Sequence, residues 1–309
     1  MVYYFSGQGN SRLVAEAIAG KLRQETCRIT RRTLDAASSA QAPDTDRPNV
    51  WVFPVHAWGV PRVVGKFIRT LASAVPGAAS GSVHHMVATC GDDIGRTDRQ
   101  WARMIRSRGW RVGGVFSVTM PNTYVCLPGF DVDSPDLARD KMRRASEDVD
   151  SIASRIADNR ADGLRMVVAG SMPRIKSHIL RPLFNAFLMS PRGFRVDRDK
   201  CDGCGTCAAV CPMGNITIDG GAPRWDHDCT MCLACYHRCP RGAVAYHFTA
   251  GKGRVGHLKN SDSQTRQTCQ TGLTCPTNPT AFILHTKKAM CFSTSPFCVC
   301  FAEPAYFLK

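Results

Sequence analysis

Short apolar runs alternate with longer amphipathic stretches over the first half of the chain. Runs rich in Val and in aromatic residues predict buried strands at residues 2–5, 49–55, 83–89 and 112–120, with a weaker candidate at 27–30. Between them, apolar residues recur every three or four positions, which predicts helices after Ser11, after Pro61, near residues 97–108 and after Ser134. Strands that alternate with helices are typical of a doubly wound parallel α/β sheet.

Three loops leave the carboxyl ends of these predicted strands. They are SGQGNS at residues 6–11, HAWGV at 56–60 and CGDDIG at 90–95. The carboxyl ends of parallel strands meet at one edge of a sheet, and ligands of such sheets bind at that edge. The three loops are therefore expected to converge on one ligand site.

The first loop has the composition of an anion-binding turn between a strand and a helix. Backbone N–H groups and the helix dipole attract an anion at such a turn, and Ser6, Asn10 and Ser11 add neutral donors. A P-loop would need a lysine, which is absent, and Arg12 stands where a dinucleotide fingerprint has its third glycine. The loop resembles the phosphate loop of flavodoxins, which bind FMN; an ordinary strand-to-helix turn is the alternative.

A cysteine pattern, C-x2-C-x2-C-x3-C-P, occurs twice, and each cysteine of the second copy lies 28 positions after its counterpart. Zinc normally takes two separated pairs of ligands, so two zinc ribbons are the weaker alternative. Three thiolates at consecutive x2 spacings instead surround an iron–sulfur cubane, and the fourth cysteine of each copy ligates the other cluster. One predicted cluster takes Cys201, Cys204, Cys207 and Cys239, and the second takes Cys229, Cys232, Cys235 and Cys211.

The segment from about residue 194 to residue 247 resembles a bacterial-type ferredoxin with two [4Fe-4S] clusters, because all eight ligand positions are cysteines. The resemblance implies a small α+β domain. Clusters held by thiolates alone usually have low potentials and carry single electrons.

The motifs YFSGQGNS, PVHAWGVP, TCGDDIG and MPNTYVCLPGFDVD precede this ferredoxin-like segment. In this order they resemble the EFR1 family of flavodoxin–ferredoxin fusion proteins, over roughly residues 1–250. The resemblance implies an FMN site in the first domain. Its phosphate loop would comprise Ser6, Gly7, Gln8, Gly9, Asn10 and Ser11, and the flavin ring would be flanked by Trp58, Gly91, Asp92, Asp93 and Gly95.

Two positions depart from the family pattern. Gln8 stands where threonine is usual and keeps a side-chain amide, and His56 stands where tyrosine is expected. Two further roles stay open on the residues alone. Trp58 either stacks on the flavin ring or belongs to the core, and the carboxylates Asp92 and Asp93 either hydrogen-bond the flavin edge or are solvated.

The stretch between the two predicted domains, residues 159–193, is basic and amphipathic. Apolar residues such as Ile179 and Leu183 alternate with basic ones such as Arg174, and Pro182 interrupts the pattern. Docking against a neighbouring domain is the simpler use of such a linker. Peripheral contact with a membrane surface is the other.

The chain has 309 residues, 16 cysteines and a formal charge of +15. Clustered cysteines, with no signal peptide and no long apolar span, favour metal binding in the reducing cytoplasm over disulfides. Lys and Arg are spread over most of the chain, and no basic helix with interleaved aromatic residues stands out. This argues against nucleic acid; an acidic redox partner or simple solubility explains the charge.

The predicted organisation has four parts. They are a flavodoxin-like FMN-binding domain (1–158), the linker (159–193), a two-cluster ferredoxin-like domain (194–250) and an atypical, poorly ordered tail (251–309). The expected function is intracellular electron transfer between two [4Fe-4S] clusters and FMN. No acid–base dyad or nucleophile triad is visible, so no substrate conversion is predicted. An Fe–S redox sensor with an empty flavodoxin-like fold is the alternative, and a nucleic-acid-binding Fe–S protein is a weaker one.

Overall fold

The computed structural model describes residues 1–37, 43–73, 81–187 and 190–255. These residues belong to one compact unit. The predicted tail lies outside the described residues from residue 256 onward, as do residues 188–189 of the linker. In the part of the chain that is described, no helix combines the length and the apolar character needed to cross a bilayer.

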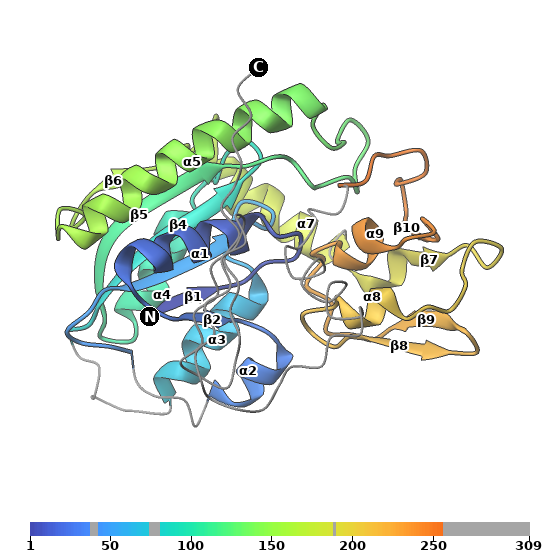
Figure 1. Cartoon of the computed structure of the whole chain (residues 1–309), viewed down its shortest axis with the longest axis horizontal. Helices are drawn as coiled ribbons and strands as arrows, with labels where there is room; N and C mark the ends of the chain where they lie inside the picture. Colours follow the sequence, from blue (N-terminus) through green and yellow to red (C-terminus); the bar gives the residue numbers. More distant parts are fainter. Residues whose placement is uncertain (38–42, 74–80, 188–189, 256–309) are drawn as a thin grey trace, which may run out of the picture. The chain divides into compact units, whose positions relative to one another are not determined.

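Six parallel strands form the sheet of the N-terminal domain, in the order β2-β1-β3-β4-β5-β6 (Figure 1). This is the flavodoxin-like order with one further strand at the edge, so the predicted fold class is confirmed. The strands are β1 (Val2–Tyr4), β2 (Thr26–Arg28), β3 (Asn49–Pro54), β4 (Val83–Cys90), β5 (Arg111–Thr119) and β6 (Arg165–Met166). The apolar runs predict β1 to β5 but not β6, which is only two residues long.

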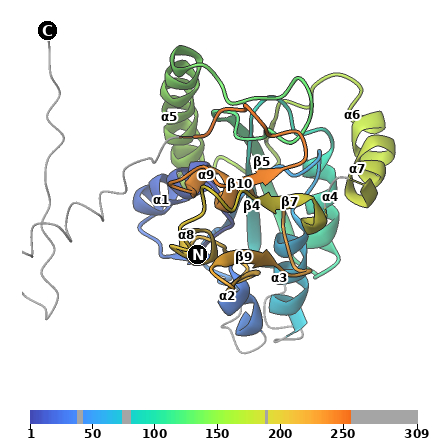
Figure 2. The ribbon, with the colours of Figure 1, turned by 90° about the vertical axis from the view of Figure 1, so that its right-hand side faces the viewer.

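Helices cover both faces of the sheet. Figure 2 shows α1 (Asn10–Leu22) and α5 (Pro135–Ala157) on the left of the strands and α3 (Arg62–Ser73) and α4 (Thr97–Arg106) on the right. The short α2 (Arg31–Asp35) packs on the same face as α3. Successive residues of a strand face opposite sides of the sheet, and side chains on both sides are buried. Because both faces are buried, the strands are continuous apolar runs in the sequence.

The start of α5 follows its predicted signal. Ser134 is the N-cap, and its side chain accepts a hydrogen bond from the backbone N–H of Leu137 at 3.4 Å. Pro135 occupies the first helical position, where its missing N–H costs no hydrogen bond. The prediction of a helix opened by Ser-Pro is confirmed.

The C-terminal domain is a small α+β unit with two antiparallel two-stranded sheets. Its elements are β7 (Phe194–Val196), α8 (Thr206–Ala209), β8 (Ile216–Asp219), β9 (Ala222–Trp225), α9 (Ala234–Arg238) and β10 (Val244–Tyr246). The 28-residue offset of the cysteines also carries α8 onto α9 and β8 onto β10, so the sequence repeat is a structural repeat.

The two domains share a packed junction. Met213 of the C-terminal domain is 6% exposed and joins the core that α2 and α3 cover. Beside it, the backbone N–H of Arg31 donates to the carbonyl of Pro212 at 2.9 Å.

The linker, which we call the connector (residues 159–193), contains β6 and then a helical segment. That segment comprises α6 (Pro173–Ile175), a π-helical turn η2 (Lys176–Leu180), α7 (Arg181–Phe187) and the 3-10 turn η3 (Pro191–Gly193). It docks on the N-terminal domain through Ser177, whose hydroxyl donates to the Trp58 carbonyl at 3.0 Å and accepts from the Arg96 N–H at 2.8 Å.

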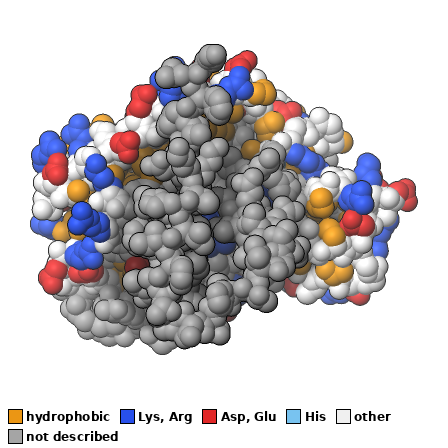
Figure 3. Space-filling view, viewed as in Figure 1, with side chains coloured by type: hydrophobic (Ala, Val, Ile, Leu, Met, Phe, Trp, Pro, Cys, Tyr) orange, Lys and Arg blue, Asp and Glu red, His pale blue; other side chains and the backbone are white. Residues whose placement is uncertain are grey.

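Charges of both signs mix on the face shown in Figure 3. Where its atoms are coloured, Lys and Arg side chains lie among Asp and Glu side chains over α5 and β6. The sequence of α5 explains the mixture, because it carries Arg139, Lys141, Arg143, Arg144 and Arg155 together with Asp136, Asp140, Glu147, Asp148 and Asp150.

Two adjacent histidines of β4, His84 and His85, are buried, at 0% and 4% exposed. Each accepts a hydrogen bond at Nδ1, His84 from the Trp51 indole and His85 from the Gly114 N–H, both at 2.8 Å. Burial lowers the pKa of His84 to about 3 and of His85 to about 4. Both rings are therefore neutral at pH 7.

We predict that His85 makes the fold acid-sensitive between pH 6.5 and pH 4. Below pH 6.5 the unfolded chain takes up a proton at this ring, which the folded chain does not until about pH 4. Between pH 7 and pH 5, the wild type should therefore lose about 2 kcal/mol more unfolding free energy than His85→Asn. Urea unfolding of both proteins at the two pH values measures this difference. Parallel losses in the two proteins would contradict the prediction.

Candidate functional site

A cavity of about 440 Å³ opens at the carboxyl edge of the sheet. The loops after β1, β3 and β4 all contribute to its wall, together with the loop after β5 and residues 231–233 of the C-terminal domain. This volume lies in the range of small-molecule and cofactor sites. The predicted flavin-site residues that line it are Ser6, Gly7, Gln8, Asn10, Ser11, Trp58, Gly91, Asp92 and Asp93, whereas Gly9 and Gly95 do not.

The amino end of α1 reaches this cavity through Asn10 and Ser11. Gly9 precedes the helix with a φ of 113°, a conformation that favours glycine, and no side chain caps the helix. The first intrahelical bond comes from Leu13, so the earlier N–H groups of the turn have no intrahelical partner. Uncapped N–H groups at the positive end of a helix dipole are suited to an anion.

The polar side chains of the first loop bond within the protein. Ser6 Oγ accepts from the Gly9 N–H at 3.1 Å, and Asn10 Nδ2 donates to the Pro121 carbonyl at 3.0 Å. Ser11 Oγ lies 2.7 Å from Thr89 Oγ1. These bonds fix the shape of the loop, and the role of the three side chains as donors to a ligand stays a prediction beside the backbone amides of the turn.

Gln8 and Gly7 join this loop to the C-terminal domain. Gln8 Nε2 donates to the Cys232 carbonyl at 2.8 Å, while its Oε1 is buried and has no hydrogen-bond partner. A Cβ added to Gly7 would lie 2.6 Å from Cys232 Cβ, so only glycine fits this contact. Gln8 is thus one of the residues that connect the two domains.

The opposite end of the cavity is formed by Trp58, Asp93 and the connector. Trp58 has a φ of 53° and lies edge-on to Phe184 of α7, with 6.3 Å between ring centroids. Lys176 of the π-turn forms an ion pair with Asp93 at 2.5 Å and lies 5.9 Å from the Trp58 ring centroid. Asp93 is therefore paired with a cation, whereas Asp92 is exposed.

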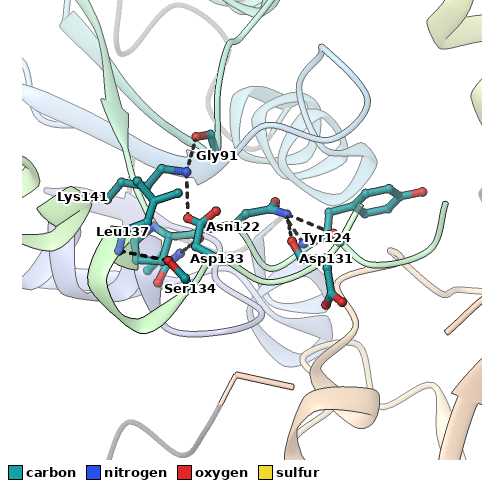
Figure 4. Close-up of polar contacts among 10 residues, drawn as sticks. Gly91, Asn122, Tyr124, Asp131, Asp133, Ser134, Leu137 and Lys141 are labelled. Carbon is teal, nitrogen blue, oxygen red and sulfur yellow. Dashed lines mark hydrogen bonds and ion pairs between the residues drawn. The ribbon is translucent and has the colours of Figure 1, made fainter. Parts of the chain in front are cut away.

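A polar network anchored on α5 holds two of the cavity loops (Figure 4). Lys141 Nζ binds the Gly91 carbonyl at 3.0 Å and Asp133 at 2.7 Å, and Asp133 accepts from the Asn122 N–H at 2.9 Å. Asn122 Nδ2 in turn donates to the Tyr124 carbonyl at 3.2 Å. Neither Asn122 nor Lys141 is among the predicted site residues. The signal that the sequence offered for Asn122 is its position, shortly after the end of the buried strand β5.

His56, the other departure from the family pattern, lies at the domain junction with Arg181 and Thr230. Its ring is edge-on to Phe5, with 6.0 Å between centroids. Burial, and then the charge of Arg181, lower the pKa of His56 to about 4. The imidazole is therefore neutral at pH 7, and besides its place at the junction it lines the 440 Å³ cavity.

The eight repeat cysteines line two separate small cavities. Each cavity combines three cysteines of one copy with the fourth cysteine of the other copy. One is lined by Cys201, Cys204, Cys207 and Cys239, and the other by Cys211, Cys229, Cys232 and Cys235. These are the two sets that the spacing assigns, and their role as cluster ligands stays a prediction.

The surroundings of these thiols suit iron–sulfur clusters. The N–H groups of Asn215, Met231 and Ala243 donate to the sulfurs of Cys211, Cys229 and Cys239, each at 3.3 Å. Burial raises the pKa of Cys229 to about 12 and also raises the pKa of Cys235. Such thiols stay protonated unless a metal binds them, and iron supplies the positive charge that holds sulfur as thiolate.

Comparison with known proteins identifies the C-terminal domain. Residues 200–244 match the 4Fe-4S dicluster domain family. An uncharacterized ferredoxin of Methanocaldococcus jannaschii is 43% identical over 54 residues, which cover 16% of this chain and 70% of that protein. The chain belongs to the ferredoxin family. A ferredoxin of Methanothermococcus thermolithotrophicus is 38% identical over 53 residues, covering 16% of this chain and 88% of its own length.

Solved structures similar to part of this ferredoxin-family chain include flavodoxins. A flavodoxin of Streptococcus pneumonia TIGR4 is 15% identical, covers 48% of this chain and 96% of its own, and has a TM-score of 0.30. A short-chain flavodoxin associated with a PDU bacterial microcompartment is 15% identical over 52% of this chain and 97% of its own, with a TM-score of 0.34. The flavodoxin-like assignment rests on the strand order itself.

We predict that Gly7→Ala weakens the contact with Cys232. The added methyl would lie 2.6 Å from Cys232 Cβ, which forces the loop and the ferredoxin domain apart and should cost about 1–3 kcal/mol. Gly20→Ala is the matched control, because Gly20 lies in α1 with nothing within 4 Å and alanine favours a helix there. Anaerobic urea unfolding measures both variants. Equal stability of the two would contradict the prediction.

Proposed function

We propose that this chain is a flavodoxin–ferredoxin fusion of the EFR1 type, in which FMN and two [4Fe-4S] clusters exchange electrons. One observation carries the proposal. Cys232, which the spacing assigns to a cluster, lines the same cavity as Gly7, Gln8 and the amino end of α1. A residue proposed to bind an iron–sulfur cluster thus forms part of the wall of the cavity proposed to hold FMN.

The proposed flavin site uses the two ends of the 440 Å³ cavity differently. The backbone amides at the amino end of α1 would bind the FMN phosphate, with no fixed positive charge. Trp58 and the loop of residues 91–93 would flank the ring, and Lys176 would place a cation near its edge. Lys141 and Asn122 would hold that loop in place.

The proposed cluster sites follow the two thiol cavities, one for Cys201, Cys204, Cys207 and Cys239 and one for Cys211, Cys229, Cys232 and Cys235. Iron–sulfur clusters carry single electrons, whereas a flavin, when bound, can take electrons singly and release them in pairs. The chain would hold the flavin and the clusters close to the domain junction, where Gln8 bonds to Cys232. It would also supply backbone N–H donors to the cysteine sulfurs.

The first thiol cavity is the more accessible one, because Cys204 is exposed. An external redox protein would therefore exchange electrons at that side, and the basic character of the chain favours an acidic partner. Reduced thiols at both cavities require a reducing compartment, so we place the protein in the cytoplasm.

A second candidate has support from the first loop. The side chains of Ser6, Asn10 and Ser11 are engaged within the protein, which would also suit an empty flavodoxin-like domain. The chain would then be a redox sensor or binding module that holds only iron–sulfur clusters. Flavin content distinguishes the two.

The first test is cofactor content after oxygen-free purification. We expect about one FMN and about eight iron atoms per chain, the flavin identified by chromatography after acid release and the iron by a chelator assay. About eight iron atoms without any flavin would favour the sensor. Zinc in place of iron would overturn the assignment of the clusters.

The second test addresses the interleaved ligands through double variants. Cys211→Ala/Cys232→Ala removes two thiols of one cavity and should cost about half of the iron. Cys211→Ala/Cys204→Ala removes one thiol from each cavity and should cost nearly all of it, although both residues belong to the first copy of the repeat. The control is Cys27→Ala in β2, outside both cavities. Greater iron loss in the first double variant would contradict the interleaved assignment.

A further inference from the structure

The helical segment of the connector docks through polar side chains and Phe184 and leaves most of its apolar side chains exposed. Lys176, Ser177 and Arg181 contact the N-terminal domain, through Asp93, the Trp58 carbonyl and the Val60 carbonyl respectively. The apolar residues that remain outside are 41–62% exposed. They are Met172, Ile175, Ile179, Leu180 and Leu183, which we call the connector ridge.

This orientation reverses the usual arrangement of an amphipathic helix. A surface helix of a globular protein normally turns its apolar stripe to the core and its polar face to water. Here the π-turn at Lys176–Leu180 contributes to the reversal, because its wider turn places residues five positions apart on one side. Lys176 and Arg181 can then both reach the N-terminal domain, and the ridge is left facing outward.

Basic side chains cover the helices α3 and α4, of which α4 lies beside α7 in Figure 2. The charged residues of α3 are all basic, and the single acid of α4, Asp98, is buried and paired with Arg165 at 2.8 Å. The exposed cations are Arg62, Lys66, Arg69, Arg99, Arg103 and Arg106. On α5, by contrast, acids balance the bases.

The ridge and this basic face adjoin each other. The Arg96 N–H, just before α4, donates to Ser177, and Arg96 Nη1 lies 3.1 Å from His178 Nε2. Arg181 donates to the Val60 carbonyl, just before α3. The connector therefore lies against the amino ends of α3 and α4, and the apolar ridge lies beside two helices whose exposed charged side chains are all basic.

We propose that this face binds the surface of a membrane rich in anionic lipids, with the connector ridge among the acyl chains and α3 and α4 on the headgroups. Apolar side chains flanked by Lys and Arg are the features with which peripheral segments bind such interfaces. Nucleic acid would satisfy the cations but offers no apolar phase for the ridge. The proposal is independent of the cofactor assignments.

The experiment uses the full chain purified without oxygen and sucrose-loaded vesicles, either phosphatidylcholine alone or with about one third phosphatidylglycerol. Sedimentation should show binding to the anionic vesicles that weakens at high salt, and much weaker binding to neutral vesicles. Comparable binding to both vesicle types, or to neither, overturns the proposal.

Two variant pairs test the two parts of the face. Ile179→Gln/Leu183→Gln should weaken binding to anionic vesicles at least about tenfold, whereas Ile218→Gln, an exposed position on β8, should not. Lys66→Glu/Arg103→Glu should weaken it similarly, while Arg139→Glu/Arg144→Glu on α5 makes the same change in net charge and should weaken it far less. All these side chains are exposed or in surface helices, so visible absorbance and circular dichroism should match the wild type.

Hydrogen exchange provides a second measurement. Amides of the connector helical segment should exchange more slowly on anionic vesicles than in solution, while those of α5 should not change. Equal binding by all variants would overturn the proposal. The proposal would also be overturned if Ile179→Gln/Leu183→Gln changed only the self-association of the chain, because the face would then bind a protein. Binding of duplex DNA that this variant leaves unchanged would overturn it too, because the face would then serve a nucleic acid.

Discussion

The close contact between the loop after β1 and Cys232 is the constraint on which the rest of the structure depends. Gly7 has no room for a Cβ against Cys232, and Gln8 spans the junction with two hydrogen bonds, from its side chain to the Cys232 carbonyl and from Arg238 to its own carbonyl. Because of this contact, residues of the ferredoxin domain form part of the wall of a cavity that belongs to the sheet. A change at this one contact therefore acts on both proposed redox sites.

The connector lies at the other end of the same cavity. It lies over the end of the sheet, where Lys176 meets Asp93 and Arg181 meets the Val60 carbonyl. Lys176 and Phe184 help to close one end of the cavity, and the apolar residues of the connector ridge remain outside. A segment that docks through its charged and hydroxyl groups leaves most of its apolar side chains facing away from the domain. For this reason the same segment contributes both to the cavity wall and to the proposed membrane face.

Local patterns predicted much of the fold. The apolar runs marked β1 to β5, and Ser134-Pro135 marked the start of α5, because strand burial and helix capping depend on neighbouring residues. The two-residue β6 and the π-turn carried no such signal. The hydrogen bonds that Ser6, Asn10 and Ser11 make within the protein also carried no local signal, since a hydroxyl or amide that can donate to a ligand can equally bond to a backbone amide, a carbonyl or a hydroxyl elsewhere in the fold.

The sequence by itself determined the sheet with its helices and the repeated cysteine motif. The spacing of that motif is a local feature, because three ligands of one cluster must lie within a few residues of each other. Only the tertiary structure decided which surfaces meet. It brought Gln8 to Cys232, more than 200 positions apart, joined Lys141 to Gly91, and left the connector ridge exposed. The physical reason is that burial and complementarity between distant segments depend on the packing of whole elements, which no local pattern of residues records.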